Sequence, residues 1–298
     1  MLHSDDGRIY YTLTGALLTN QIRTSPDQKL APFDTSAFVA ASRTVCGPFS
    51  WIDDMVPVSL FGKTDPGLRR SNNEDAFLIA PEVGLHLLAD GMGGAAAGEL
   101  ASQIFAETAR ELLSRTPPAT EEERLQLIQQ AFEQANGRIL DHVATQPEHR
   151  GMGCTAELLI LWNSRFVLGH VGDSRTYLYR KGQLKQLTRD HSLVQDQVDQ
   201  GIITAEEART HRLRHVILRA VGTTETLAVD FLRGNTFAGD LFLLCSDGLT
   251  DMVDDVLIES ILALPDALPQ KVEKLIEAAK AAGGHDNITV ILSEVVAP

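Results

Sequence analysis

Aspartates recur at the ends of apolar segments in this chain of 298 residues. Three apolar runs end in an aspartate that is followed by Gly or Ser: Asp90 in LHLLADGMGG, Asp173 in RFVLGHVGDSR and Asp247 in LFLLCSDGL. A fourth aspartate, Asp286 in HDNITVIL, stands just before an apolar run. Because strand ends of a packed sheet are rigid and several can meet at one edge, we expect these four carboxylates to converge.

Converging carboxylates indicate a bound cation, since they repel one another and raise their own pKa values unless a positive charge compensates. The adjacent acids Glu74 and Asp75 in RRSNNEDAF precede another predicted strand, and Gly91 could bring its own carbonyl close to an ion. Oxygen ligands without a His or Cys cluster select Mg²⁺ or Mn²⁺ over zinc. A single Asp-Gly after a strand is usually only a turn, but the repetition favours a metal site.

Two arginines, Arg69 and Arg70, lie shortly before the Glu74–Asp75 pair. A guanidinium group presents a planar fork that matches phosphate bidentately. Surface arginines are often merely solvated, yet beside a cluster that binds divalent ions they indicate a phosphate ester as the ligand.

Short apolar runs of strand length, separated by turn residues, begin after Pro57. The predicted strands are 76–80, 85–89, 155–162, 166–171, 176–179, 228–232, 241–245 and 288–295. Predicted helices cover 98–113, 121–144 and 268–282, and a short helix begins at Thr204; the pairs Thr120/Glu123 and Thr204/Glu207 predict capping boxes. Two long helices follow one another and strands then run in succession, which indicates an α+β fold of antiparallel sheets covered by helices. Residues 1–57 lack any period and are interpreted as an N-terminal extension of unknown role, with the main domain at 58–298.

The composition excludes several classes of protein. A hydrophobic content of 44% and a charged content of 22% are typical of a globular chain. Lys and Arg number 26 against 40 Asp and Glu, so the net charge of −14 repels nucleic acid and anionic membranes. The three cysteines, Cys46, Cys154 and Cys245, predict no disulfide framework, and no export signal or membrane-spanning run is visible. We expect a cytoplasmic protein that binds neither nucleic acid nor membrane.

Seven motifs, taken together, resemble one family. TDPGLRRSNNEDAF, ADGMGG, GMGCTA, VGDSR, LTRDHSLVQ, SDGL and GGHDNITV occur in the order and at the spacing of the metal-dependent serine/threonine protein phosphatases, the PPM or type 2C family, in its bacterial form. The resemblance covers about residues 60–295. It implies a four-layer α-β-β-α sandwich in which two central antiparallel β-sheets are flanked by helices, with metal ions at one end.

The resemblance also implies roles for the residues singled out above, with two Mn²⁺ or Mg²⁺ ions and a third, weaker one as cofactors. Asp90 would bridge two ions, the carbonyl of Gly91 would be a further ligand, Asp247 and Asp286 would complete the first site, and Glu74 would support the second. Asp75 would lie in the outer shell, Asp173 with Asp247 would hold the third ion, and Arg70 rather than Arg69 would bind the phosphate.

The chemistry implied is hydrolysis of phosphoserine or phosphothreonine by a hydroxide that bridges two metal ions, without a phosphoenzyme. Cys154 and Cys245 are therefore expected to pack in the core and not to act as nucleophiles. Met92 stands where many eukaryotic members carry a histidine, so the proton for the leaving oxygen must come from another source. In the flap, at about 190–220, His215 replaces an Asn or Ser, and we hypothesise that it supplies a nitrogen ligand or a pH-dependent charge beside the third ion. Arg212 and Arg214 in the same flap are either solvated or recruit acidic or phosphorylated partners.

We therefore predict a protein phosphatase that opposes a bacterial Ser/Thr kinase, with phosphorylated proteins, including the kinase and its substrates, as partners. One alternative is a pseudophosphatase, a binding module that has lost its metals; it predicts a missing aspartate, and none is missing. A second is a hydrolase of small phosphate esters, and a third is a partner-switch regulator that acts on one dedicated phosphoprotein.

Overall fold

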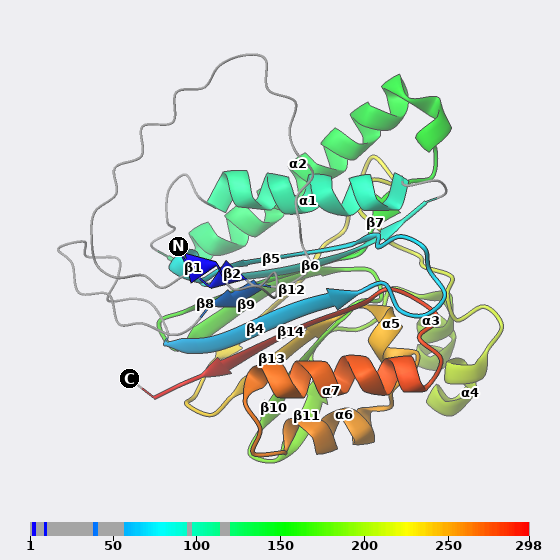
Figure 1. Cartoon of the computed structure of the whole chain (residues 1–298). Helices are drawn as coiled ribbons and strands as arrows, with labels where there is room; N and C mark the ends of the chain where they lie inside the picture. The colour runs from blue at the N-terminus through cyan, green and yellow to red at the C-terminus, as the bar shows by residue number, and fades with distance from the viewer. Residues whose placement is uncertain are drawn as a thin grey trace.

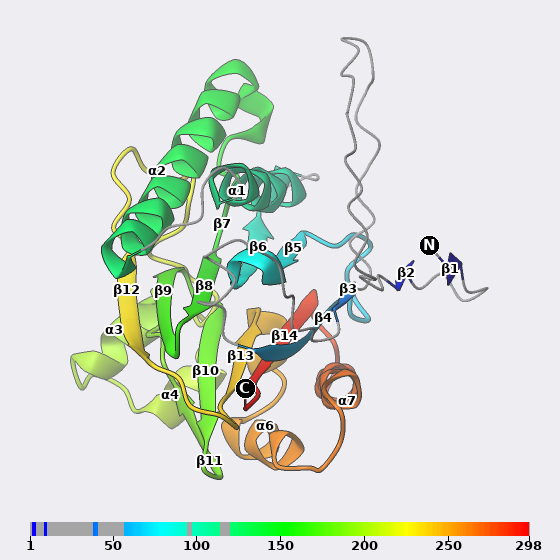
Figure 2. The same ribbon diagram turned by 90° about the vertical axis from the view of Figure 1, so that its left-hand side faces the viewer.

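Two antiparallel β-sheets pack face to face in a computed structural model of this chain, and helices cover both outer faces (Figure 1). The structure describes residues 57–93, 97–113 and 120–297, together with the backbone of three short strands, β1 (Leu2–His3), β2 (Ile9–Tyr10) and β3 (Phe38–Ala40). Turned by a quarter, the layers are seen in the order helices, sheet, sheet, helices (Figure 2). The predicted four-layer α+β sandwich is confirmed.

The strands of the first sheet lie in the order β12-β9-β8-β6-β5, and β7 pairs with β6 beside this path. Those of the second sheet lie in the order β1-β2-β3-β4-β14-β13-β10-β11, and β2–β3 is the parallel pair. The remaining strands are β4 (Val58–Asp65), β5 (Asp75–Ala80), β6 (Leu85–Met92), β7 (Gly153–Cys154), β8 (Ala156–Trp162), β9 (Arg165–Val171), β10 (Arg175–Arg180), β11 (Gln183–Gln186), β12 (Asp230–Asn235), β13 (Leu241–Cys245) and β14 (Ile288–Val295).

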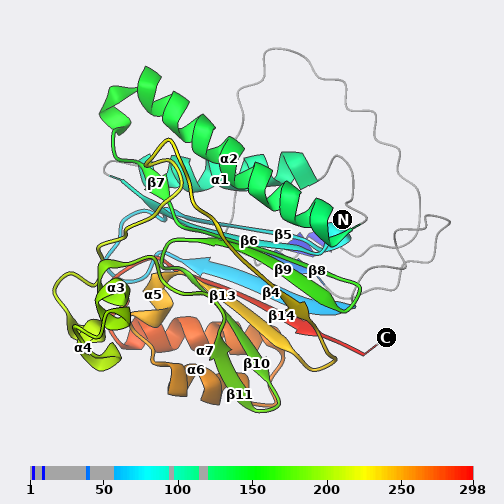
Figure 3. The same cartoon turned by 180° about the vertical axis from the view of Figure 1, so that it is seen from behind.

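The helices divide into three groups. α1 (Ala97–Leu113) and α2 (Glu121–Thr145) cover the first sheet, whereas α6 (Asp255–Leu262) and α7 (Leu268–Ala281) cover the second (Figure 1). α3 (Leu193–Asp199), α4 (Ala205–Thr210) and α5 (Asp247–Thr250) gather at one end of the sandwich, as the view from behind also shows (Figure 3). Short 3₁₀ turns, η2 (Pro81–Val83) and η3 (Pro147–His149), complete the set. None of the helices in the described part of the chain has the length and apolar character needed to cross a bilayer.

The predicted elements are all present, with two shifts. The strand expected at 85–89 continues to Met92, so Asp90 and Gly91 lie inside β6 and not after it, and the strand expected at 228–232 is β12, displaced to 230–235. Both predicted capping boxes are formed, at Thr120 with Glu123 and at Thr204 with Glu207. The strands β1 to β4, β7 and β11 and the helices α3, α5 and α6 were not predicted, mostly because they are short or, like QLKQ in β11, carry no apolar run. The division of the chain at residue 57 stays a prediction.

Alternation along β6 explains how the sheet positions its aspartate. Leu87 belongs to the core between the first sheet and its helices, whereas Leu88 belongs to the core between the two sheets, where Phe242 and Ile291 of the second sheet also lie. Successive side chains of a strand point to opposite faces, so Asp90, two residues after Leu88, faces the second sheet. The apolar layer between the sheets thus ends in carboxylates.

Candidate metal centre

The four aspartates singled out in the sequence lie together at the end of the sandwich that carries α5. Burial raises the pKa of Asp90 well above its ordinary value, and the charges of Asp75, Asp247, Asp173 and Asp286 raise it further. Burial likewise raises the pKa of Asp247, followed by the charges of Asp173, Asp251, Asp286 and Asp75. Like charges within reach of one another disfavour ionisation in this way, so the structure brings these four carboxylates together.

Asp75 lies directly opposite Asp90, because the register of β5 and β6 pairs these two residues. Its Oδ2 accepts hydrogen bonds from Thr289 Oγ1 at 2.5 Å and from Ser246 Oγ at 2.9 Å. Its Oδ1 is buried and has no hydrogen-bond partner among the described residues. Burial outweighs these hydrogen bonds and raises the pKa of Asp75 to about 6. Residues of the second sheet and the start of α5 therefore bind Oδ2 of Asp75, whereas Oδ1 is unpaired.

The backbone carbonyl of Glu74 is bound by residues of β6 and α1. Its carbonyl accepts hydrogen bonds from Gly91 N at 3.1 Å and from Ser102 Oγ at 2.6 Å. A Cβ atom at Gly91 would lie 2.1 Å from the carbonyl oxygen of Gly98 and 2.5 Å from that of Glu74, so only glycine fits there. Glu74 Oε1 accepts from Asn72 Nδ2 at 3.2 Å. The Asp-Gly pair of β6 is thus packed tightly against the loop that carries Glu74.

Asp173 follows β9 and is buried, with Oδ1 lacking a hydrogen-bond partner among the described residues. Burial raises its pKa to about 7, and the charges of Asp190 and Asp251 add to the effect. Thr155, from the GMGCTA motif, ties this loop to β6, since its Oγ1 accepts from Asp90 N at 3.2 Å and lies 2.7 Å from Ser174 Oγ.

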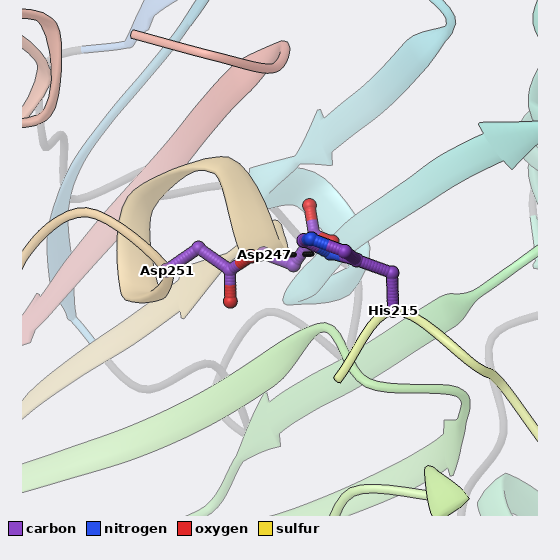
Figure 4. Close-up of side chains that lie close together, drawn as sticks. All are labelled: His215, Asp247 and Asp251. Atoms are coloured by element: carbon purple, nitrogen blue, oxygen red, sulfur yellow. Dashed lines mark ion pairs between the residues drawn. The ribbon is translucent and has the colours of Figure 1, made fainter. Parts of the chain in front are cut away.

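Asp247 begins α5, and Asp251 lies one turn later, with Asp251 N donating to the carbonyl of Asp247 at 2.8 Å. His215, from the flap, brings its Nδ1 to 3.3 Å from Asp251 Oδ2 (Figure 4). One ligand atom from each of the three residues lies within 4.8 Å of the others. Asp251 was not predicted, although its position four residues after Asp247 puts both on one face of a helix, which was the available signal.

The loop before β5 is anchored on the strand that begins after Asp286. Arg70 Nη2 donates to Asp286 Oδ2 at 2.7 Å, so the predicted arginine lies at the edge of the acidic cluster. Asn287 accepts from Glu74 N at 2.9 Å and donates to the carbonyls of Pro66 and Asn72 at 3.2 and 2.9 Å. This bridging role of Asn287 was not predicted from the sequence.

Cys154 and Cys245 are fully buried, and burial raises the pKa of both thiols well above the ordinary range. A buried thiol of this kind is a poor nucleophile, which agrees with the expected packing role. Cys46 lies outside the described residues.

The residues present fit a hard divalent cation. The cluster consists of carboxylates from β5, β6, the loop after β9, α5 and the loop before β14, and it raises its own pKa values. Two of its buried oxygens, on Asp75 and Asp173, have no hydrogen-bond partner among the described residues. Oxygen donors with unsatisfied negative charge are the ligands that Mg²⁺ and Mn²⁺ prefer.

Comparison with known proteins identifies the class. Residues 69–292 match the model of the protein phosphatase 2C family, and the chain belongs to this family, which is metal-dependent. The chain is 41% identical over 234 residues to the serine/threonine protein phosphatase PstP of Mycobacterium tuberculosis, a match that covers 78% of this chain and 44% of PstP. It is 35% identical over 236 residues to the serine/threonine phosphatase stp of Listeria innocua, covering 78% of this chain and 94% of that protein.

A solved structure shows the same fold with metal bound. The catalytic domain of PstP in complex with two manganese ions superposes with a TM-score of 0.73 at 38% identity, covering 80% of this chain and 99% of that one. The chain thus spans less than half the length of the curated PstP sequence but nearly all of its solved catalytic domain.

Proposed function

We propose that this protein hydrolyses phosphoserine and phosphothreonine in proteins and depends on Mn²⁺ or Mg²⁺ for this activity. The observation that carries the proposal is the convergence of Asp90, Asp173, Asp247 and Asp286 at one end of the sandwich. There the charges of Asp173 and Asp286 raise the pKa values of both Asp90 and Asp247, after burial as the largest cause. Membership of the protein phosphatase 2C family supports the same reaction.

The proposed ligands are members of this cluster, in the roles that the family resemblance implies. Asp90, the carbonyl of Gly91, Asp247 and Asp286 would hold two ions, with Glu74 supporting the second and Asp75 behind them. Asp173 and Asp247 would hold a third ion, with His215 and Asp251 as its neighbours. Divalent cations lower the pKa of water and neutralise phosphate oxygens, which is the chemistry that this site needs from them.

Arg70 is proposed to bind the phosphate. Its guanidinium donates one hydrogen bond to Asp286, and the side chain is 47% exposed, so further N–H groups are available to an incoming phosphate. Asp286 thereby orients the fork at the edge of the cluster, where a phosphate would be attracted electrostatically and bound bidentately. Arg70→Ala is expected to raise KM for a phosphopeptide by about tenfold, whereas Arg69→Ala, at the adjacent exposed position, changes it little.

The substrate is proposed to be a phosphorylated protein, as for the phosphatases PstP and stp, and the opposing enzyme a bacterial Ser/Thr kinase. The exposed flap, with Arg212 and Arg214, offers a surface for residues around the phosphate. A hydrolase of small phosphate esters would use the same cluster, and it predicts equal kcat/KM for a phosphothreonine peptide and for free phosphothreonine. A partner-switch regulator predicts turnover of one phosphoprotein only.

The test is hydrolysis of a phosphothreonine peptide by the purified chain with Mn²⁺ or with a chelator. We expect activity that requires Mn²⁺ and that Asp247→Asn reduces by about a hundredfold or more. Asp141→Asn, which removes an exposed carboxylate on α2, is the matched control and should behave as the wild type. Activity that persists in the chelator or in Asp247→Asn would refute the proposal, and a folded but inactive wild type would favour a pseudophosphatase.

A further inference from the structure

The motif LTRDHSLVQ lies beside the motif VGDSR in the fold, although neither His191 nor Arg175 belongs to the proposed metal ligands. Arg175 donates to Asp190 through Nε at 2.9 Å and through Nη2 at 2.7 Å, a bidentate ion pair that is largely buried. This pair brings the segment around residue 190 against the loop that carries Asp173. The residue next to Asp190, His191, then reaches the turn that precedes Asp173.

His191 binds both peptide groups of Gly172. The backbone N–H of His191 donates to the carbonyl of Gly172 at 2.7 Å, and Gly172 N donates to the imidazole Nδ1 of His191 at 3.1 Å. Gly172 has φ of +116°, and a Cβ atom there would lie 2.4 Å from Thr155 Cβ, so the turn takes a backbone conformation reserved for glycine. Glycine has wide conformational freedom, so the geometry of this turn depends on the groups that bind it, and His191 supplies two of those bonds.

The hydrogen bonds define the protonation state of His191. Because Nδ1 accepts from Gly172 N, it carries no proton, and the proton of the neutral ring is on Nε2. Nε2 lies 3.2 Å from Asp230 Oδ2, to which it donates, and 3.0 Å from Arg219 Nη1, which itself donates to the other oxygen of Asp230 at 2.9 Å. Burial lowers the pKa of His191 to about 4, which agrees with a neutral ring. The imidazole is therefore fixed at both nitrogens, between the Asp173 turn and β12.

The same residue closes the base of the flap. The carbonyl of His191 accepts from Leu218 N at 2.7 Å, and Leu193 N donates to the carbonyl of Val216 at 2.9 Å. The two ends of the segment 192–218 are joined at this point. That segment carries Arg214 and His215, whose side chains lie 3.6 and 3.3 Å from Asp251 Oδ2.

We propose that His191 is a positioning residue that fixes the Asp173 turn and the base of the flap in one register, so that Asp173 and His215 reach the metal centre together. The inference rests on the proposed function only in that the centre binds a cation. Partners of metal ligands that act through hydrogen bonds in this way change metal affinity by about 10- to 100-fold when removed.

Two variants separate the bonds that the His191 side chain makes, and a third serves as a control. His191→Asn retains an acceptor near the position of Nδ1 and so the bond to Gly172, whereas His191→Gln retains a donor near Nε2 and loses that acceptor. His86→Gln is the matched control, because it alters another fully buried histidine, on β6, that makes no bond to either segment. All proteins are compared after treatment with a chelator and again with Mn²⁺.

The first readout is amide hydrogen exchange in the chelator-treated, metal-free proteins, a measurement that does not depend on catalysis. His191→Gln should exchange the amides of Gly172 and Leu218 about tenfold or more faster than the wild type, with His191→Asn retaining most of the protection at Gly172. The second readout is Mn²⁺ binding followed by electron paramagnetic resonance, in which His191→Gln should weaken the weakest site by about tenfold. If His86→Gln gives the same exchange and binding changes, or if His191→Gln gives none, the positioning role is overturned. If the exchange and binding changes occur as expected but the wild type does not hydrolyse phosphopeptides, the positioning role of His191 stands and only the proposed function is refuted.

Discussion

His86 is a buried imidazole whose replacement should make the protein more resistant to acid. It lies on β6 two residues before Leu88, on the face that packs against the second sheet, and its side chain is fully buried. Neither ring nitrogen has a hydrogen-bond partner among the described residues. Burial therefore lowers its pKa from 6.5 to about 4.

The magnitude follows from this difference in pKa. Between pH 6.5 and pH 4 the unfolded chain holds a proton on this imidazole that the folded protein does not hold, so the free energy of unfolding falls as the pH falls. The contribution of His86 is complete above pH 6.5 and is lost progressively toward pH 4. The full loss is about 3 kcal/mol, of which roughly 2 kcal/mol is reached at pH 5.

The test compares His86→Leu with the wild type by urea unfolding, followed through tryptophan fluorescence, in the presence of a chelator. The advantage of the variant should grow by roughly 2 kcal/mol between pH 7.5 and pH 5. Ser293→Ala is the control, because it removes a buried hydroxyl that has no partner among the described residues but does not titrate, so its effect should be equal at both pH values. An advantage of His86→Leu that is the same at pH 7.5 and pH 5 would show that His86 protonates freely in the folded protein and would refute the reasoning.

Three further predictions concern the metal centre and the helix α2. Asp75→Asn should weaken Mn²⁺ binding, measured by titration. In the presence of a chelator it should stabilise the protein at pH 7.5 by at most about 3 kcal/mol, because the pKa of Asp75 is raised to about 6 and the cost of its charged form grows as the pH rises from 3.8 through 6. A variant that is less stable than the wild type in the chelator would contradict this. Gly248→Ala would place a Cβ 1.9 Å from the carbonyl oxygen of Asn287, so it should displace the Asp286 loop and lower Mn²⁺ affinity, and unchanged affinity would count against the packing argument. Thr120→Ala removes the cap of α2 and should lower the free energy of unfolding by about 1 kcal/mol, which Thr120→Ser should largely restore.

The fold could be predicted where the periodicity was long. The helix at 121–144 was anticipated almost to the residue because its apolar positions recur over many turns and its start carries a capping box. The short helix α5 was missed because four residues cannot show a period. β11 was missed because an exposed edge strand with the sequence QLKQ has no apolar face to reveal it. The pairing of strands into two sheets is a long-range property, and it came from the family resemblance.

The candidate site divides in the same way. The convergence of Asp90, Asp173 and Asp247 was predictable, since each follows or ends an apolar run and strand ends meet at sheet edges. Asp251 required knowledge that Asp247 begins a helix. The contact between His191 and Gly172 joins residues 19 positions apart and leaves no trace in local spacing, so only the structure reveals it.

The buried polar atoms without hydrogen-bond partners are of two kinds, and only one kind points to a metal site. Asp75 Oδ1 and Asp173 Oδ1 lie among carboxylates that raise one another's pKa values, so a cation there would relieve both the repulsion and the missing bonds. His86 lacks partners too, but it lies on the face of β6 that carries Leu88, toward the apolar layer between the sheets, and no carboxylate contributes to its lowered pKa. The two kinds of unpaired buried atom therefore predict different outcomes of substitution. An apolar residue at position 86 should raise stability and leave metal affinity unchanged, whereas replacement of either aspartate should lower metal affinity and raise the stability of the metal-free protein.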